Sequence, residues 1–337
     1  MIYIKRVNLN EQQEVNDDIK IKLSYVTKRF DMFAQKSDKI KDFLSFRKKE
    51  TPKLWALRGI SFQLKTGESL GIIGVNGSGK STLSNIIAGV LPPTTGKVDI
   101  NGEISIISIS SGLKNELTGI DNIRLKLLMS GYKNTEIESV MEDIISFSEL
   151  GEQINQPIKN YSSGMKARLG FSIMVHLNPD IMIVDEALAV GDASFKKKCE
   201  KKITEFKKQG KTFVLVSHNM SEIKRLCEKT AWIDHGELKR FDDTIKVLDD
   251  YQKSVKQYNG LAEEQRNEIE AQKREERMNF DINDYFDSVT STVDVDAKTK
   301  LSQHFFDMTM DRMSKLTLLI NISLLFLMVY LIIREVS

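Results

Sequence analysis

Residues 69–83, SLGIIGVNGSGKSTL, contain the pattern that decides the fold. The apolar residues at the start of this stretch predict a short buried strand, and residues 82–90 predict a helix. Between them stands Gly74-x-x-x-x-Gly79-Lys80-Ser81, whose glycines allow backbone N–H groups to converge on phosphate oxygens. A strand, a glycine-rich loop and a helix in this order predict a nucleotide-binding loop.

The chemistry of this loop explains its residue types. We expect Lys80 to reach the β- and γ-phosphates and the Ser81 hydroxyl to ligate Mg²⁺. The start of the helix adds a partial positive charge. The alternative is a glycine-rich turn without a ligand, which the flanking strand and helix disfavour. The residues expected to bind ATP in this loop are Gly74, Val75, Asn76, Gly77, Ser78, Gly79, Lys80, Ser81 and Thr82.

Composition limits the classes of protein that remain. The chain has 337 residues, enough for one large or two ordinary domains. Its 49 basic and 47 acidic residues nearly balance, so no overall basic field for nucleic acid is expected. The two cysteines, Cys199 and Cys227, show no metal-ligand spacing and fit a reducing compartment as buried thiols. The N-terminus has no apolar run, so no secretory signal is expected.

Two further buried strands are predicted to end in functional side chains. Residues 181–184 are an unbroken apolar run followed by Asp185 and Glu186, and residues 212–216 lead to His218. Strands that alternate with helices predict a parallel sheet with its ligand at the carboxyl ends of the strands. There we expect Asp185 to hold Mg²⁺ and Glu186 to act as the general base for the attacking water. The alternatives are a solvated loop carboxylate for Glu186 and a structural role for His218.

The region before the loop predicts a pair of strands. Residues 21–27 and 54–64 have strand patterning, and residues 28–53 between them are interpreted as an inserted surface loop with some helix. Phe30 or Trp55 would be the platform for the adenine ring, and either is equally compatible with ordinary aromatic packing. Phe30 is the candidate carried into the predicted ATP site.

The region after the loop predicts further strands and then helices. Residues 97–109 are interpreted as strands around the hairpin dipeptide Asn101-Gly102. Apolar residues recur with a helical period in residues 121–150, and another helix is expected over residues 167–177.

Taken together, these motifs resemble the nucleotide-binding subunit of an ABC transporter. The sequences GVNGSGKS, YSSGM, IMIVDEA, VGD and VSHN occur in that family's order and approximate spacing, over about residues 20–250. The resemblance implies a head-to-tail dimer with ATP sandwiched at its interface. It implies that Ser162, Ser163 and Gly164 of one copy contact the γ-phosphate held by the other. Glu186 would then activate water, and His218 would contact the γ-phosphate.

Longer stretches, among them residues 76–113 and 178–192, are similar to the ATPase subunits of teichoic acid exporters, within the polysaccharide-export branch. This resemblance implies a multi-spanning permease partner and lipid-linked teichoic acid as the transported substrate. Export of another, O-antigen-like polysaccharide and a non-transport regulatory ATPase are the alternatives. The family's glutamine loop falls near residues 104–113, where no glutamine stands and Ser108 or a neighbour takes the position. Tyr161 and Ser163 replace the Leu and Gly of the common signature.

The C-terminal part differs in character from the rest. Residues 261–278 are dense in Glu, Lys and Arg and are interpreted as an exposed helix or spacer. Residues 316–333 are apolar and would reach about 27 Å as a helix, which predicts a single transmembrane anchor. The alternative is a buried or docking helix. Because ATP is cytoplasmic, the anchor would place the catalytic domain on the cytoplasmic side of the cell membrane, in weak agreement with the flanking basic residues.

The expected fold class is therefore α/β. It comprises a P-loop ATPase with a parallel core sheet, an antiparallel β subdomain, a helical subdomain and a C-terminal transmembrane helix. The expected segments are a lead-in (1–20), a nucleotide-binding domain (21–250, its helical subdomain about 115–175), a charged and flexible spacer (251–315), a transmembrane helix (316–333) and an outer tail (334–337).

Overall fold

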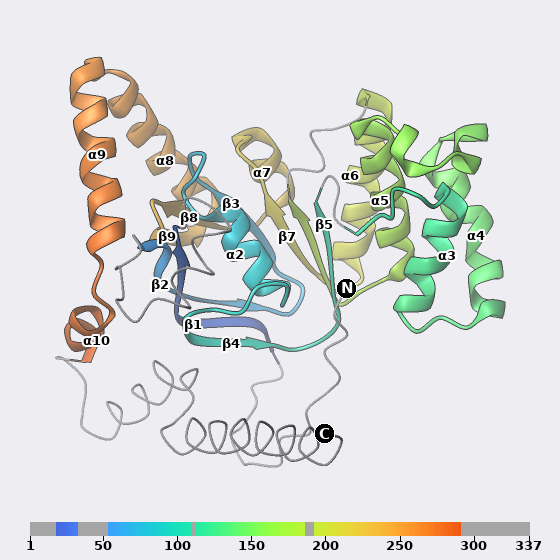
Figure 1. Ribbon diagram of the computed structural model, residues 1–337, viewed down its shortest axis with the longest axis horizontal. Coiled ribbons are helices and arrows are strands. Elements are labelled where there is room, and N and C mark those ends of the chain that lie inside the picture. Colours follow the sequence, from blue (N-terminus) through green and yellow to red (C-terminus); the bar gives the residue numbers. More distant parts are fainter. Residues whose placement is uncertain (1–17, 33–52, 109–111, 186–191, 291–337) are drawn as a thin grey trace, which may run out of the picture.

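A computed structural model of the chain describes residues 18–32, 53–108, 112–185 and 192–290 (Figure 1). The expectations for Glu186, for most of the inserted loop and for residues 291–337 concern residues outside these ranges. The fold is built on two sheets, with helices on both sides of the larger one (Figure 1).

The larger sheet carries the predicted nucleotide-binding loop. Its six strands run in the order β5-β6-β7-β3-β8-β9, and neighbours are parallel except β8 and β9. All five residues of β3, β6 and β7 are buried, as expected of central strands covered on both faces. The strands are β5 (Ile104–Ser108), β6 (Ile181–Asp185), β7 (Thr212–Val216), β3 (Ser69–Ile73), β8 (Lys229–Asp234) and β9 (Glu237–Asp243).

Each face of this sheet has its own hydrophobic core, because successive side chains of a strand point to opposite faces. Ile181 and Ile183 of β6 belong to the core shared with the smaller sheet and with α2 (Lys80–Ile87). Met182 and Val184 belong to the opposite core. The helices contributing to that opposite core are α5 (Ser163–Leu177), α6 (Ala193–Lys208), α7 (Met220–Leu226) and α8 (Thr244–Asn259).

The smaller sheet is antiparallel, with the order β2-β1-β4. Its strands are β1 (Ile19–Asp31), β2 (Lys53–Lys65) and β4 (Thr95–Ile100). The hairpin expected around Asn101-Gly102 is wrong, because β4 pairs with β1 whereas β5 pairs with β6 of the other sheet. Asp180 accepts a hydrogen bond from the Glu103 N–H at 2.9 Å, so the turn directs the chain from one sheet into the other.

A helical subdomain lies to one side of the larger sheet (Figure 1). It contains α3 (Gly119–Met129), α4 (Asn134–Ser148), the short 3₁₀ helices Gly151–Asn155 and Ile158–Asn160, and α5. These elements share a third hydrophobic core that includes Ile123, Ile144 and Leu169. The apolar residues recurring with a helical period in the sequence are therefore those that pack this subdomain.

Two further helices follow α8 and lie beside the smaller sheet (Figure 1). They are α9 (Glu263–Asn279) and α10 (Ile282–Thr290). The Trp55 ring of β2 packs edge-on against Phe280, with ring centroids 5.1 Å apart. The Tyr285 hydroxyl of α10 donates to the Gly59 carbonyl of β2 at 3.1 Å. The charged segment after residue 260 is therefore joined to the nucleotide-binding domain at β2.

The expectation of a transmembrane helix is wrong for the residues that the structure describes. No helix in the described ranges between residues 18 and 290 is both long enough and apolar enough to cross a bilayer. The longest of them, α9, has 17 residues and is dense in charged side chains, which are costly in hydrocarbon. Residues 316–333, on which the expectation rested, lie outside the described residues. An apolar run in a sequence shows only that a segment is long enough to span a bilayer. The fold class that the described residues support is that of a P-loop ATPase.

Candidate nucleotide-binding site

The carboxyl ends of four neighbouring strands meet at one edge of the larger sheet. The backbone of Ile72 in β3 is paired with Val216 in β7, and Val216 is paired with Asp185 at the end of β6. Asp185 is in turn paired with Ser108, the last residue of β5. The loop that starts at Gly74, the carboxylate of Asp185 and the turn that carries His218 therefore leave the sheet side by side. This is the edge where parallel α/β sheets bind their ligands.

The glycine-rich loop is held closely against neighbouring backbone. Gly79 has φ +111°, and a Cβ atom there would lie 2.7 Å from the Ala56 carbonyl oxygen. At Gly74 a Cβ atom would lie 2.0 Å from the Ile233 carbonyl oxygen. Both positions therefore require glycine for close backbone approach. Helix α2 begins at Lys80, directly after Gly79, so its N-terminus lies at the end of the loop.

The Lys80 side chain folds back onto the glycine-rich loop that precedes it. Its ammonium group donates hydrogen bonds to the carbonyl oxygens of Gly74 at 2.9 Å and Val75 at 3.0 Å. The Ser78 hydroxyl is buried and has no hydrogen-bond partner among the described residues. A buried polar group without a partner is costly, and a phosphate oxygen would satisfy it. The charge and this hydroxyl together suit the loop to an anion.

Asp185 is 8% exposed and is positioned from α2. The Ser84 hydroxyl donates to the Asp185 carboxylate at 3.2 Å and lies 3.1 Å from the Ser81 carbonyl oxygen. Ser84 stands three residues after Ser81, so both side chains lie on one face of the first turns of α2. Ser81 is one candidate Mg²⁺ ligand, and Ser84 orients the other candidate ligand, Asp185. The sequence prediction did not include Ser84, although this helical spacing was the available signal.

The donors of this arrangement fit Mg²⁺ better than a transition metal. A serine hydroxyl and a carboxylate are hard oxygen ligands, and Mg²⁺ in nucleotide sites usually takes one or two protein ligands together with phosphate oxygens. No group of three or more His, Cys, Asp and Glu side chains able to hold a metal ion is found in the described part of the chain. Ser81 and Asp185 therefore suit an ion delivered with a nucleotide.

His218 is exposed and lies on a turn that a buried network holds in place. The Ser217 hydroxyl donates to the Glu222 carboxylate at 3.0 Å and accepts from the Asn219 N–H at 3.0 Å. Glu222 is also paired with Lys196 of α6. This network was not predicted, because a serine and a glutamate five residues apart carry no distinctive sequence signal.

The predicted signature residues lie in a different part of the molecule. Ser162 is the N-cap of α5, and its hydroxyl accepts a hydrogen bond from the Met165 N–H at 3.2 Å. Ser163 and Gly164 form the first turn, and both serines are exposed. In Figure 1 this helix belongs to the helical subdomain, away from α2 and its loop. The structure therefore does not bring Ser162, Ser163 and Gly164 together with the loop of the same chain.

The two aromatic candidates for the adenine platform differ in their surroundings. Trp55 is 5% exposed, because its ring packs against Phe280 and the Arg29 guanidinium lies 5.5 Å from its centroid. Phe30 is 41% exposed, with the Lys28 ammonium 5.5 Å from its ring. Of the two, only Phe30 presents a ring surface to a ligand.

Buried thiols take no part in this site. Cys199 and Cys227 both lie in the core on the face of the sheet covered by α5 to α8. Burial raises the pKa of the Cys199 thiol to about 12, and it raises the pKa of Cys227 as well. Both thiols are therefore protonated and unreactive at neutral pH.

The fold and the glycine-rich loop define a P-loop ATPase. The family model described as ABC transporter matches residues 57–189. A solved ATP-binding cassette dimer with bound ADP and phosphate has a TM-score of 0.56 and 24% identity, over 66% of this chain and 98% of that one. A dimeric bacterial ABC transporter cassette has the same TM-score at 25% identity, with the same coverage of both chains.

Curated relatives are considerably more similar in sequence to this chain than these solved structures are. The teichoic acids export ATP-binding protein of Levilactobacillus brevis is 49% identical over 271 residues, which is 80% of this chain and 75% of that protein. The protein of the same name from Listeria innocua is 52% identical over 242 residues, 72% of each chain. The chain therefore belongs to the teichoic acids export family of ABC ATP-binding subunits, and it is an ABC ATPase.

Proposed function

We propose that this chain hydrolyses ATP to ADP and phosphate in order to drive the export of lipid-linked wall teichoic acid through a membrane permease. The observation that carries the ATPase part is the alignment of Gly74, Asp185 and His218 at one edge of the sheet. The assignment of the substrate rests on the names of relatives that are about half identical to this chain in sequence.

The residues of the loop would act mainly by holding phosphates. Lys80 would exchange its two loop carbonyls for the β- and γ-phosphate oxygens, and the Ser78 hydroxyl would gain the partner that it lacks among the described residues. Ser81 and Asp185 would hold Mg²⁺, which supplies charge stabilisation to the transferring phosphoryl group. Positioning and electrostatics of this kind provide most of the catalysis in phosphoryl transfer.

Hydrolysis also requires an oriented water molecule. In our proposal, Glu186 accepts the proton of the water whose oxygen bonds to the γ-phosphorus, while the bond from that phosphorus to the ADP oxygen breaks. His218 contacts the γ-phosphate from the turn after β7. Glu186 follows Asp185, the last residue of β6, directly in the sequence.

Two copies are needed for a complete site. Ser162, Ser163 and Gly164 lie on the helical subdomain, so in a head-to-tail pair they would meet the γ-phosphate held by the other copy. The start of α5, where Ser162 and Ser163 are exposed, suits an anion. A solved cassette that is 25% identical to this chain is a dimer, which supports this assembly.

The transport partner would be a separate permease with several membrane spans. The described part of this chain contains no helix able to cross a bilayer. Association with that permease would place the ATPase at the cytoplasmic side of the membrane.

Replacement of the chromosomal copy by Glu186→Gln tests the proposal. Loss of a general base lowers turnover by roughly a hundredfold to ten-thousandfold, so ATP should still bind while hydrolysis stops. We expect wall phosphate to fall in cells carrying only this variant, and to be restored by the wild-type gene. Normal wall phosphate with abolished hydrolysis would refute teichoic acid as the substrate, whereas hydrolysis at the wild-type rate would refute the role of Glu186.

A further inference from the structure

The C-terminal helix α9 contacts the nucleotide-binding loop directly. The Arg277 side chain donates from Nη1 to the Gly77 carbonyl oxygen at 3.2 Å and from Nε to the Trp55 carbonyl oxygen at 3.0 Å. Gly77 is part of the predicted phosphate loop, and Trp55 is on β2. Arg277 therefore connects a segment outside the family match at residues 57–189 to the candidate ATP site.

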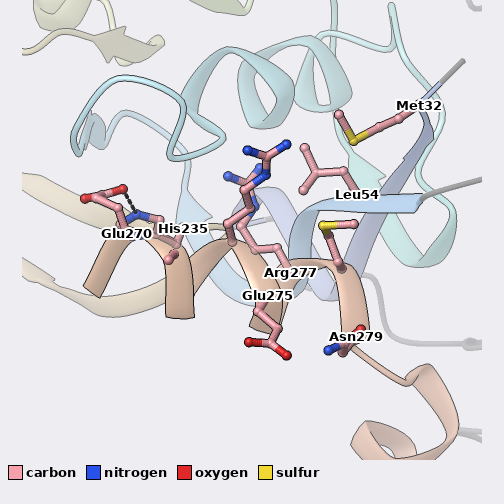
Figure 2. Close-up of a pocket in the computed structure, with 10 residues that line it drawn as sticks. Met32, Leu54, His235, Glu270, Glu275, Arg277 and Asn279 are labelled. Atoms are coloured by element: carbon pink, nitrogen blue, oxygen red, sulfur yellow. Dashed lines mark hydrogen bonds and ion pairs between the residues drawn. The ribbon is translucent and has the colours of Figure 1, made fainter. Parts of the chain in front are cut away.

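A cavity of about 780 Å³ lies beside this contact. Figure 2 shows Arg277 rising from α9 between His235 on one side and Met32 and Leu54 on the other. His235 belongs to the turn in which the Gly236 N–H donates to the Ser78 carbonyl of the phosphate loop at 2.8 Å. Helix α9 and the turn at residues 235–236, which form two walls of the cavity, are thus both hydrogen-bonded to the phosphate loop.

One part of the cavity lining is apolar and open to a ligand. Met32 and Met278 are among the most exposed large apolar side chains of the described chain, at 42% and 38%. Leu54 is the cross-strand partner of Phe30, and such partners place their side chains on the same face of a sheet. Phe30, the candidate adenine platform, therefore lies on the same face of the smaller sheet as Leu54, which lines the cavity.

The α9 side of the cavity carries two guanidinium groups, from Arg274 and Arg277, and two carboxylates, from Glu270 and Glu275. Arg274 lines the cavity and has neither a hydrogen bond nor an ion pair with any other described residue. Arg277 donates to backbone carbonyls only, and no described residue accepts from its Nη2. Burial and the charge of Arg58 lower the pKa of Arg277. The Glu275 carboxylate points away from Arg277 in Figure 2, and Glu270 is hydrogen-bonded to His235 and Tyr258.

An apolar side, and two guanidinium groups that no described carboxylate engages, lie next to the phosphate loop and suit one class of ligand. A purine nucleotide has an apolar, stackable base at one end and negative charge at the other. We infer that α9 forms a wall of the ATP site, with the base against Met32, Leu54 and Met278 and the phosphates facing Arg274 and Arg277. This inference rests on the proposed ATP site, and it assigns nucleotide-binding residues to the C-terminal helix.

Nucleotide affinity of the full-length chain measured by calorimetry tests this inference. Arg274→Ala removes an exposed guanidinium without a described partner, so it should fold normally and weaken ATP binding about threefold to tenfold. Arg277→Ala should weaken binding by about tenfold or more. Arg266→Ala removes a guanidinium from the same helix outside the cavity and should bind ATP within about twofold of the wild type.

A second readout locates the base. Photolabelling with 8-azido-ATP should modify peptides that contain Met32 or residues 271–279, and unlabelled ATP should compete for that labelling. Unchanged ATP affinity in Arg274→Ala and Arg277→Ala, with normal binding by the wild type, would overturn the inference and leave the ATP site intact. Tighter binding by either variant would show that α9 obstructs the site. Absence of ATP binding by the wild type would instead refute the proposed function.

Discussion

At the scale of single residues, His235 provides a pH-dependent contact between the core and α9. Its ring contacts the Asp234 carboxylate at 2.7 Å and the Glu270 carboxylate of α9 at 3.2 Å. The hydrogen bond to Asp234 and the negative charges of both partners raise the pKa of His235 above 6.5, against the opposing effect of burial. The contact is therefore strongest when the imidazole is protonated.

The raised pKa of His235 makes the free energy of unfolding depend on pH. A raised folded-state pKa stabilises the fold fully below about pH 6.5, and the contribution is lost as pH rises through the folded-state pKa. His235 has φ +47°, which asparagine tolerates, so His235→Asn removes the ring with little backbone cost. We expect this variant to lower the free energy of unfolding by about 1 kcal/mol at pH 6 and by much less at pH 9. An equal loss at both pH values in urea titrations would contradict this account.

At the scale of elements, the docking of α10 on β2 depends on a glycine. Gly59 has φ +79°, and a Cβ atom there would lie 2.0 Å from the Tyr285 hydroxyl oxygen. Gly59→Ala should therefore displace Tyr285 and release α10, in addition to a strain of about 1–3 kcal/mol for the backbone. Limited proteolysis should then cut within residues 282–290 faster than in the wild type.

Gly210→Ala is the matched control for this prediction. Its φ is +74°, nearly the same, but no atom lies within 4 Å of the position that a Cβ would take. It should lose stability through backbone strain alone and leave the cleavage rate within α10 unchanged. If both variants expose α10 equally, the contact between Tyr285 and Gly59 does not hold the helix.

The elements that the sequence predicts correctly are those set by short local patterns. The loop at Gly74 and the strand before Asp185 were predictable, because each rests on a short pattern in a strand–loop–helix context. The contact of Arg277 with Gly77 joins residues far apart in the chain, and no local pattern specifies it. The Asn101-Gly102 hairpin was wrong because a turn signal does not reveal which sheet the next strand joins.

At the scale of the whole molecule, the candidate site is divided between two surfaces. The phosphate loop and Asp185 lie at the edge of the larger sheet, whereas Ser162, Ser163 and Gly164 begin a helix of the separate helical subdomain. In Figure 1 these two regions lie apart within one chain. In our proposal, one ATP site therefore takes its loop from one copy and its signature residues from another.

Phosphate release by mixed variants tests whether two copies share one ATP site. Lys80→Ala removes the charge of the loop, and Ser163→Arg places a bulky side chain at the exposed start of α5. Each variant alone should hydrolyse ATP roughly a hundredfold more slowly than the wild type, because every site in it is defective. When the two are co-expressed, mixed pairs contain one intact site, so we predict that a substantial part of the wild-type rate returns. A mixture as inactive as either variant alone, or full activity in Ser163→Arg by itself, would contradict the shared site.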